Sequence, residues 1–132
     1  MTAYRILVVD DYPSSAQITC TLLELLGHVT TSARTGKQAL ELGGSFQPDL
    51  VILDIGLPDI SGFDVARALR SAAGNRKLFL AALTGWGQPE DRSRALAAGF
   101  DHHVLKPASA AKLRDILRRA ELVLSAGDPA TA

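Results

Sequence analysis

The chain has 132 residues, of which 47% are hydrophobic and 21% are charged, a composition typical of one ordinary globular domain. Its 14 basic and 14 acidic residues balance, which argues against a general nucleic-acid binder. A single cysteine excludes an intramolecular disulfide, and no apolar run approaches the ~20 residues that a membrane span needs. We therefore expect a cytoplasmic protein without a membrane segment, in which Cys20 fills space in the core.

The hydrophobic pattern predicts strands and helices in strict alternation. The strands are expected at residues 4–9, 29–33, 50–53, 78–84 and 103–105. The helices are expected at residues 13–26, 35–42, 63–73, 89–98 and 113–124. Such alternation is typical of right-handed βαβ units, so the predicted fold is α/β with a parallel sheet covered on both faces. The chain length favours the compact, five-stranded form of the doubly wound sheet.

Turn and cap residues predict where two of the helices begin and end. Pro13 can occupy the first turn of the first helix, where its missing N–H costs nothing. Thr35 and Gln38 match a capping box, which predicts the start of the second helix. The pair Gly43 and Gly44 is expected to end that helix.

The segment 49–62 organises the rest of the chain. Its unbroken apolar run, 50–53, fits a strand buried on both faces, and Asp54 ends the run. A carboxylate at the carboxyl end of a central parallel strand lies where open α/β sheets bind their ligands. The alternative is that Asp54 only caps a turn or a helix, as Asp often does.

Polar residues end four of the five predicted strands. They are Asp10 and Asp11 after the first strand, Asp54 after the third, Thr84 at the fourth and Lys106 after the fifth. Because the carboxyl ends of parallel strands meet at one edge, these side chains are expected to converge. That convergence favours a functional site over independent capping.

Carboxylates packed this closely repel one another, by about 4 kcal/mol for two charges ~4 Å apart at an effective dielectric of ~20. Lys106 offsets one charge, and the rest calls for a divalent cation with oxygen ligands, for which Mg²⁺ is suited. The sequence contains neither of the glycine-rich phosphate-binding motifs, the P-loop and the GxGxxG motif. A bound cation would let Asp54 attack a phosphoryl group, with the metal and Lys106 balancing the charge on its oxygens.

These residues resemble the receiver domains of two-component response regulators, over the span from Ile6 to Leu124. The resemblance rests on Asp10-Asp11, Asp54 with Pro58 and Gly62 behind it, Thr84 followed by Gly85, and Lys106-Pro107. It implies a flavodoxin-like sheet of five parallel strands in the order 2-1-3-4-5. We expect a receiver domain at residues 1–124 and a flexible tail at 125–132.

The resemblance also implies a phosphoacceptor signalling domain, which is not an enzyme but assists its own phosphorylation and dephosphorylation. Asp54 would accept the phosphoryl group from the phosphohistidine of a histidine kinase or a histidine phosphotransfer protein. Thr84 would then move to bond a phosphoryl oxygen, and Lys106 would pair with it. The implied Mg²⁺ ligands are Asp11, Asp54 and the backbone carbonyl of Gly56, with Asp10 helping through water.

One position departs from the family pattern. Three residues before the lysine, receivers usually carry Tyr or Phe, a switch ring that turns inward as Thr84 moves, and here that residue is His103. His103 is either a half-exposed strand histidine or a replacement for the switch ring. The segment 100–103 also resembles receivers attached to hybrid histidine kinases. Trp86 would shield the phosphoryl group from water or pack on the helix that begins at Pro89.

Two other functions compete with this one. A phosphohydrolase of the haloacid dehalogenase type carries a second Asp two residues after its nucleophile, where this chain has Gly56. A receiver-like docking module would keep the fold without being phosphorylated.

We expect the face of Arg92, His102 and the last helix to contact a partner or a second copy, so a homodimer is one candidate. Both a single-domain regulator and a part of a longer protein are compatible with the short tail.

Overall fold

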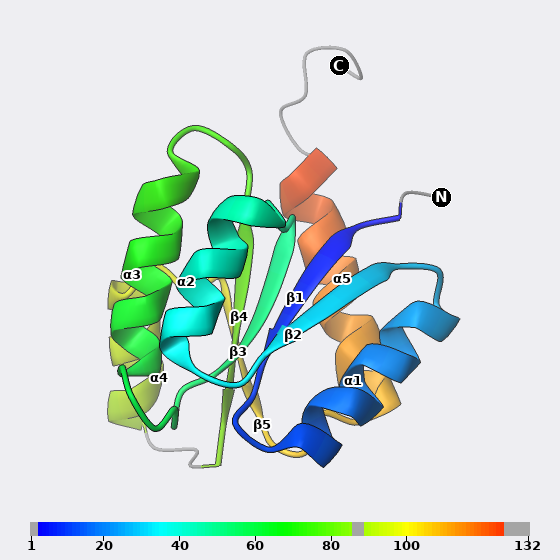
Figure 1. Ribbon diagram of the computed structural model, residues 1–132, viewed down its shortest axis with the longest axis horizontal. Helices are drawn as coiled ribbons and strands as arrows, with labels where there is room; N and C mark the ends of the chain where they lie inside the picture. The colour runs from blue at the N-terminus through cyan, green and yellow to red at the C-terminus, as the bar shows by residue number, and fades with distance from the viewer. Residues whose placement is uncertain (1–2, 86–88, 126–132) are drawn as a thin grey trace.

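The computed structural model describes residues 3–85 and 89–125, and Figure 1 shows a parallel sheet between two layers of helices. The strands are β1 (Arg5–Val9), β2 (Val29–Ala33), β3 (Leu50–Asp54), β4 (Phe79–Thr84) and β5 (His102–Leu105). The helices are α1 (Pro13–Leu25), α2 (Gly36–Ser45), α3 (Gly62–Ala73), α4 (Pro89–Ala97) and α5 (Ala110–Ser125). The strand order is β2-β1-β3-β4-β5, with every neighbouring pair parallel, so the predicted fold and order are confirmed.

The register of the sheet aligns the carboxyl ends of four strands. The pairs at this edge are Val9 with Leu53, Asp54 with Leu83, and Thr84 with Leu105. Residues that directly follow β1 and β5 therefore come level with the last residues of β3 and β4. This alignment is what brings the predicted site residues to one edge.

Two apolar cores lie on opposite faces of the sheet. Helices α1 and α5 cover one face, and α2, α3 and α4 cover the other (Figure 1). Side chains alternate across β3, so Leu50 and Ile52 join the first core while Val51 and Leu53 join the second. Both faces of β3 are buried, which explains its unbroken apolar sequence.

The predicted helix starts are confirmed at α1 and α2. Pro13 is the first residue of α1. At α2, the Thr35 hydroxyl accepts a hydrogen bond from the backbone N–H of Gln38 at 3.1 Å. The returning bond differs from a capping box, because the Gln38 side chain accepts from the N–H of Arg34 at 2.8 Å instead of that of Thr35.

The prediction that Gly43 and Gly44 end the second helix is wrong. Helix α2 continues through both to Ser45. A Cβ atom at Gly43 would lie 2.5 Å from Cδ2 of Leu69, so the absence of a side chain there lets α2 and α3 approach each other. A Cβ at Gly44 would meet nothing within 4 Å, and this glycine serves no such contact.

The last helix is longer than predicted. It begins at Ala110 because the Ser109 hydroxyl accepts a hydrogen bond from the backbone N–H of Lys112 at 3.3 Å. It ends at Ser125, the first residue of the predicted tail, whose hydroxyl donates to the carbonyl of Glu121. Residues 126–132 lie outside the described part, so the domain boundary at 124 stays a prediction. Within the described part, none of the helices has the length and apolar character needed to cross a bilayer.

Candidate functional site

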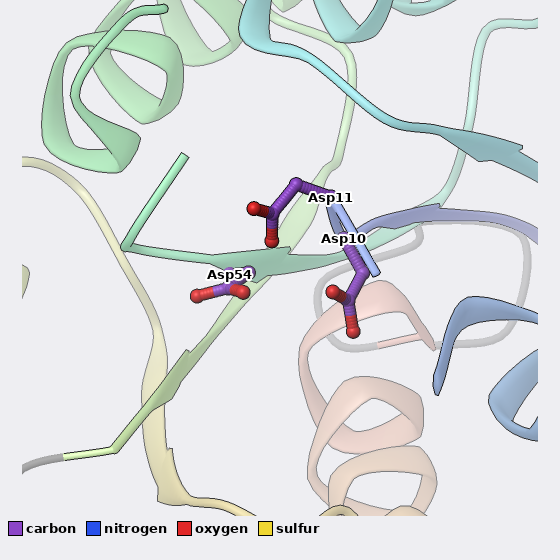
Figure 2. Close-up of side chains that lie close together, drawn as sticks. All are labelled: Asp10, Asp11 and Asp54. Carbon is purple, nitrogen blue, oxygen red and sulfur yellow. The ribbon is translucent and has the colours of Figure 1, made fainter. Parts of the chain in front are cut away.

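Three aspartates meet at the carboxyl edge of the sheet. Figure 2 shows Asp10 and Asp11, which follow β1, beside Asp54 at the end of β3. One carboxylate oxygen from each lies within 4.8 Å of the others. Asp10 and Asp54 are only 3% and 4% exposed, whereas Asp11 is exposed to solvent. The convergence predicted for these acids is confirmed.

Both carboxylate oxygens of Asp54 have partners. Its Oδ2 accepts from Nζ of Lys106 at 2.6 Å, and its Oδ1 accepts from the backbone N–H of Gly56 at 2.9 Å. Charge-assisted contacts of this length fix the orientation of the carboxylate. Asp54 is thus held in one orientation by an ammonium group that directly follows β5, the strand two positions away in the sheet.

Asp10 is fixed by the turn that it begins. Its Oδ1 accepts from the backbone N–H of Tyr12 at 2.9 Å, and its own N–H donates to the carbonyl of Ala33 at 3.0 Å. Its second carboxylate oxygen and both oxygens of Asp11 make no hydrogen bond within the described part of the chain. Several hard oxygen donors with one solvent-exposed member match the preference of Mg²⁺, which takes a few carboxylates and keeps waters.

Thr84 and Lys106 complete the predicted set. Thr84 is 5% exposed at the end of β4, and its carbonyl accepts from the backbone N–H of Lys106 at 2.8 Å. The peptide bond between Lys106 and Pro107 is cis. Of the residues predicted to bind the metal or the phosphoryl group, all except Asp10 border one cavity of about 360 Å³. Its described lining is Asp11, Asp54, Ile55, Gly56, Phe63, Thr84, Gly85, Arg94 and Lys106.

The lining also holds Phe63 and Arg94, a contacting pair that was not predicted from the sequence. The guanidinium carbon of Arg94 lies 4.4 Å from the centroid of the Phe63 ring, a cation–π arrangement. Phe63 lies in the first turn of α3, and Arg94 is one of several polar residues on the short helix α4. Neither follows a strand end, so the rule that found the other residues does not reach them.

The chain matches the family model of the response regulator receiver domain over residues 6–118. It belongs to the response regulator receiver family. The predicted resemblance is therefore confirmed at the level of the family. Attachment to a hybrid histidine kinase stays a prediction.

This receiver is similar to part of each of several longer proteins. It is 41% identical to the probable transcriptional regulatory protein TcrX of Mycobacterium tuberculosis, over 86% of this chain and 50% of that protein. It is 32% identical to RpaA of Synechocystis, described as a DNA-binding dual master transcriptional regulator, over 90% of this chain and 51% of that protein. The chain thus spans about half the length of the curated relatives that it matches.

Solved receiver structures superpose on the whole sheet. The chemotaxis protein CheY4 of Vibrio cholerae gives a TM-score of 0.84 at 26% identity, covering 90% of this chain and 99% of that chain. A CheY-like receiver of Methanospirillum hungatei gives 0.81 at 26% identity, covering 89% and 92%. These likenesses agree with the flavodoxin-like order of the strands.

His102 and His103 lie on β5, away from the cavity at Asp54. His103 is half-buried and pairs in register with Ala82, and with His102 it borders two surface cavities between α4 and α5. Whether His103 replaces the switch ring stays a prediction. Nε2 of His102 lies 3.5 Å from Oδ2 of Asp115, but burial and the nearby charge of Arg119 lower the pKa of His102 below its usual value.

Two further predictions concern side chains outside the described part of the receiver. Trp86 lies in the segment 86–88, between β4 and α4. Arg92 belongs to α4, but the position of its side chain is not described. The roles proposed for both residues stay predictions.

Proposed function

We propose that this receiver accepts a phosphoryl group from a phosphohistidine onto Asp54, as a step of a two-component phosphorelay. The observation that carries the proposal is the buried Asp54 carboxylate, oriented by Lys106 at 2.6 Å and lying beside two more carboxylates. A single nucleophilic anion next to a fixed cation and a set of metal-type oxygens suits phosphoryl transfer.

Mg²⁺ is the cofactor that we propose, held by Asp11, Asp54 and the carbonyl of Gly56, with Asp10 acting through water. The support is chemical: the donors are hard oxygens, and the exposed Asp11 leaves room for water in the coordination sphere. The ion would neutralise charge shared by the attacking carboxylate and the phosphoryl oxygens.

The residues of the chain have separate roles in the transfer. A carboxylate oxygen of Asp54 attacks phosphorus, the P–N bond of the donor breaks, and its electron pair returns to the imidazole nitrogen. Lys106, already bonded to Asp54, then pairs with a phosphoryl oxygen. The Thr84 hydroxyl, at the border of the same cavity, supplies a second donor.

The partner in this scheme is a histidine kinase or a histidine phosphotransfer protein, and we place the transfer in the cytoplasm. The chain acts as a signalling domain that assists its own phosphorylation and dephosphorylation, rather than as an enzyme with a separate substrate. A receiver-like docking module that is never phosphorylated is the alternative. Binding of Mg²⁺ separates the two, because a pure docking role gives no reason to keep the acid cluster.

The decisive experiment is incubation of the chain with Mg²⁺ and acetyl phosphate, followed by intact mass spectrometry. We expect one added phosphoryl group on the wild type and none on Asp54→Asn. Asp64→Asn is the matched control, because Asp64 is an exposed aspartate that pairs with Arg67 on the surface of α3. Equal labelling of the Asp54 variant would contradict the proposal. Turnover of a generic phosphomonoester would instead favour the phosphohydrolase.

We also propose that the surface of α4, β5 and α5 contacts a partner or a second copy. Leu96 and Leu105 are 64% and 46% exposed there, next to the cavities that His102 and Lys112 border. Arg118 instead borders a cavity near the amino ends of β1 and β2, with Tyr4 and His28. Leu105→Glu should therefore disrupt the contact in a size-exclusion or pull-down assay more than a charge reversal at Arg118.

A further inference from the structure

The positively charged side chain of Arg94, on helix α4, lines the cavity at Asp54. The other cation, Lys106, follows β5 and already bonds Asp54 at 2.6 Å. Arg94 lies on α4 and borders the same cavity from the side of Phe63. The cavity is therefore flanked by positive charge from two separate elements.

The Phe63 ring provides a fixed platform for the guanidinium of Arg94. Phe63 is 6% exposed, and its ring makes an edge-to-face contact with Phe100 at a centroid distance of 6.4 Å. Arg94 lies over the face of that ring at 4.4 Å. A guanidinium stacked on a buried ring has fewer orientations open to it than one on a free surface side chain.

The charge of Arg94 is not neutralised by any carboxylate whose side chain the structure describes. By contrast, Arg67 and Arg70 each pair with an aspartate at 2.9 Å and 2.7 Å. Among the described residues, the guanidinium of Arg94 thus contacts the Phe63 ring and faces the cavity that it borders.

We propose that Arg94 binds the phosphoryl group once it is on Asp54. Phosphorylation replaces one carboxylate charge with a group of about −2 charge and three strong acceptor oxygens. Each of these oxygens accepts more than one bond, so the ammonium, the hydroxyl and the proposed Mg²⁺ leave acceptor capacity unused, and the planar fork of Arg can bond two oxygens at once. Arg94 would then join α4 to the phosphorylated site. This inference rests on the proposed function and adds a residue to it.

The test is the affinity of the full chain for beryllium fluoride in the presence of Mg²⁺, measured by titration calorimetry. Beryllium fluoride on Asp54 presents electronegative atoms where the phosphoryl oxygens would be. We expect Arg94→Gln to weaken this binding by about tenfold, the size of one charge-assisted bond. Arg94→Lys should also bind more weakly, because it keeps the charge but loses the fork. Arg67→Gln, an equal change of charge on α3, should match the wild type.

Binding of Mg²⁺ alone and hydrogen exchange complete the experiment. Mg²⁺ affinity without the fluoride should stay within about twofold for all variants, because Arg94 offers no metal ligand. Amides of α4 should gain protection with the fluoride in the wild type but not in Arg94→Gln. Wild-type affinity in Arg94→Gln, or full affinity in Arg94→Lys, would overturn the role of Arg94 while the proposed function stands. A wild type that neither binds the fluoride nor accepts phosphate would overturn both.

Discussion

Asp59 accepts a hydrogen bond from the backbone N–H of Gly36 at 2.8 Å, and this contact joins the loop after β3 to the first turn of α2. The second oxygen of the same carboxylate accepts from the N–H of Lys37 at 3.0 Å. An acidic side chain thus satisfies two of the donors that a helix start leaves open, near the positive end of the helix dipole. The loop that it anchors also carries Gly56, the proposed carbonyl ligand.

Asp59→Ala should therefore affect both stability and metal binding. Loss of the two hydrogen bonds frees the first turn of α2 and the loop at Gly56, so we expect a lower melting temperature and weaker Mg²⁺ binding. Calorimetric melting and Mg²⁺ titration check this. Asp64→Ala, which removes an exposed acid of α3, should change neither. Unchanged Mg²⁺ affinity in Asp59→Ala would show that the loop keeps its shape without the cap.

The same carboxyl group should make stability depend on pH at the acidic end. The backbone N–H groups of Gly36 and Lys37 lower the pKa of Asp59 in the folded chain. The unfolded chain then binds this proton at higher pH than the folded one. The stability that ionised Asp59 contributes is fully present above the pKa of Asp59 in the unfolded chain. It is lost as the pH falls through the lowered pKa of Asp59 in the folded chain. Urea melts of Asp59→Asn should show a shallower loss of stability with acid than the wild type, and parallel curves would refute the coupling.

Burial of His28 predicts a second pH effect nearer neutrality. Its Nδ1 accepts from the N–H of Tyr4 at 3.0 Å, and burial lowers the pKa of His28 below the ordinary value of 6.5. The unfolded histidine therefore takes up a proton at higher pH than the folded one. The stability that neutral His28 contributes should be fully present above pH 6.5. It should decrease as the pH is lowered below 6.5, until the ring is protonated in the folded chain as well. His28→Gln should remove that part of the pH dependence in urea melts.

Two glycine substitutions should act in opposite directions. A Cβ at Gly62 would lie 2.6 Å from Cα of Ile55 and 3.0 Å from the carbonyl of Asp54, both of them rigid backbone. Gly62→Ala should cost about 1–3 kcal/mol of unfolding free energy and reduce phosphorylation, because it displaces the loop after Asp54. Gly44→Ala, with open space around it, should gain about 0.5–1 kcal/mol as a better helix former. Denaturant melts of both variants against the wild type decide the sign.

Arg70 joins three segments at the amino edge of the sheet. Its guanidinium donates to the carbonyls of Leu78 and Gly99, each at 2.5 Å, and to Asp101 at 2.7 Å. Arg70→Gln should destabilise the fold by about 1–3 kcal/mol, because two partly buried carbonyls lose a charged donor. Labelling of Asp54 in the folded fraction should persist, since this cluster lies far from the site edge. The control Arg67→Gln should stay within about 0.5 kcal/mol of the wild type.

The fold and most of the site were predictable because they follow from periodicity and topology. The unbroken apolar runs of β3 and β4 predict strands covered on both faces, and parallel strands bring Asp54, Thr84 and Lys106 to one edge. Each of these side chains directly follows or ends a strand. Their mutual approach therefore needed no knowledge of loop conformation.

The remaining features depend on contacts between elements distant in the sequence. Gly43 lies inside a helix, where a glycine is needed because Leu69 of another helix occupies the place of a side chain. Arg94 enters the site because Phe63 supports it, and Asp59 caps a helix that precedes it in the chain. Local sequence propensities cannot predict contacts with partners this far away in the chain. Gly residues in particular read as breaks when their neighbours are unknown.

The cluster around Arg70 also has a mechanical consequence for α4. By bonding the carbonyl of Gly99, it fastens the chain just beyond the last turn of that helix to α3 and to the start of β4. The opposite end of α4 begins near the carboxyl edge, where the acid site lies. If α4 moves on phosphorylation of Asp54, it should therefore rotate about its fixed carboxyl end. The displacement should be largest at Pro89 and close to zero at Ala97.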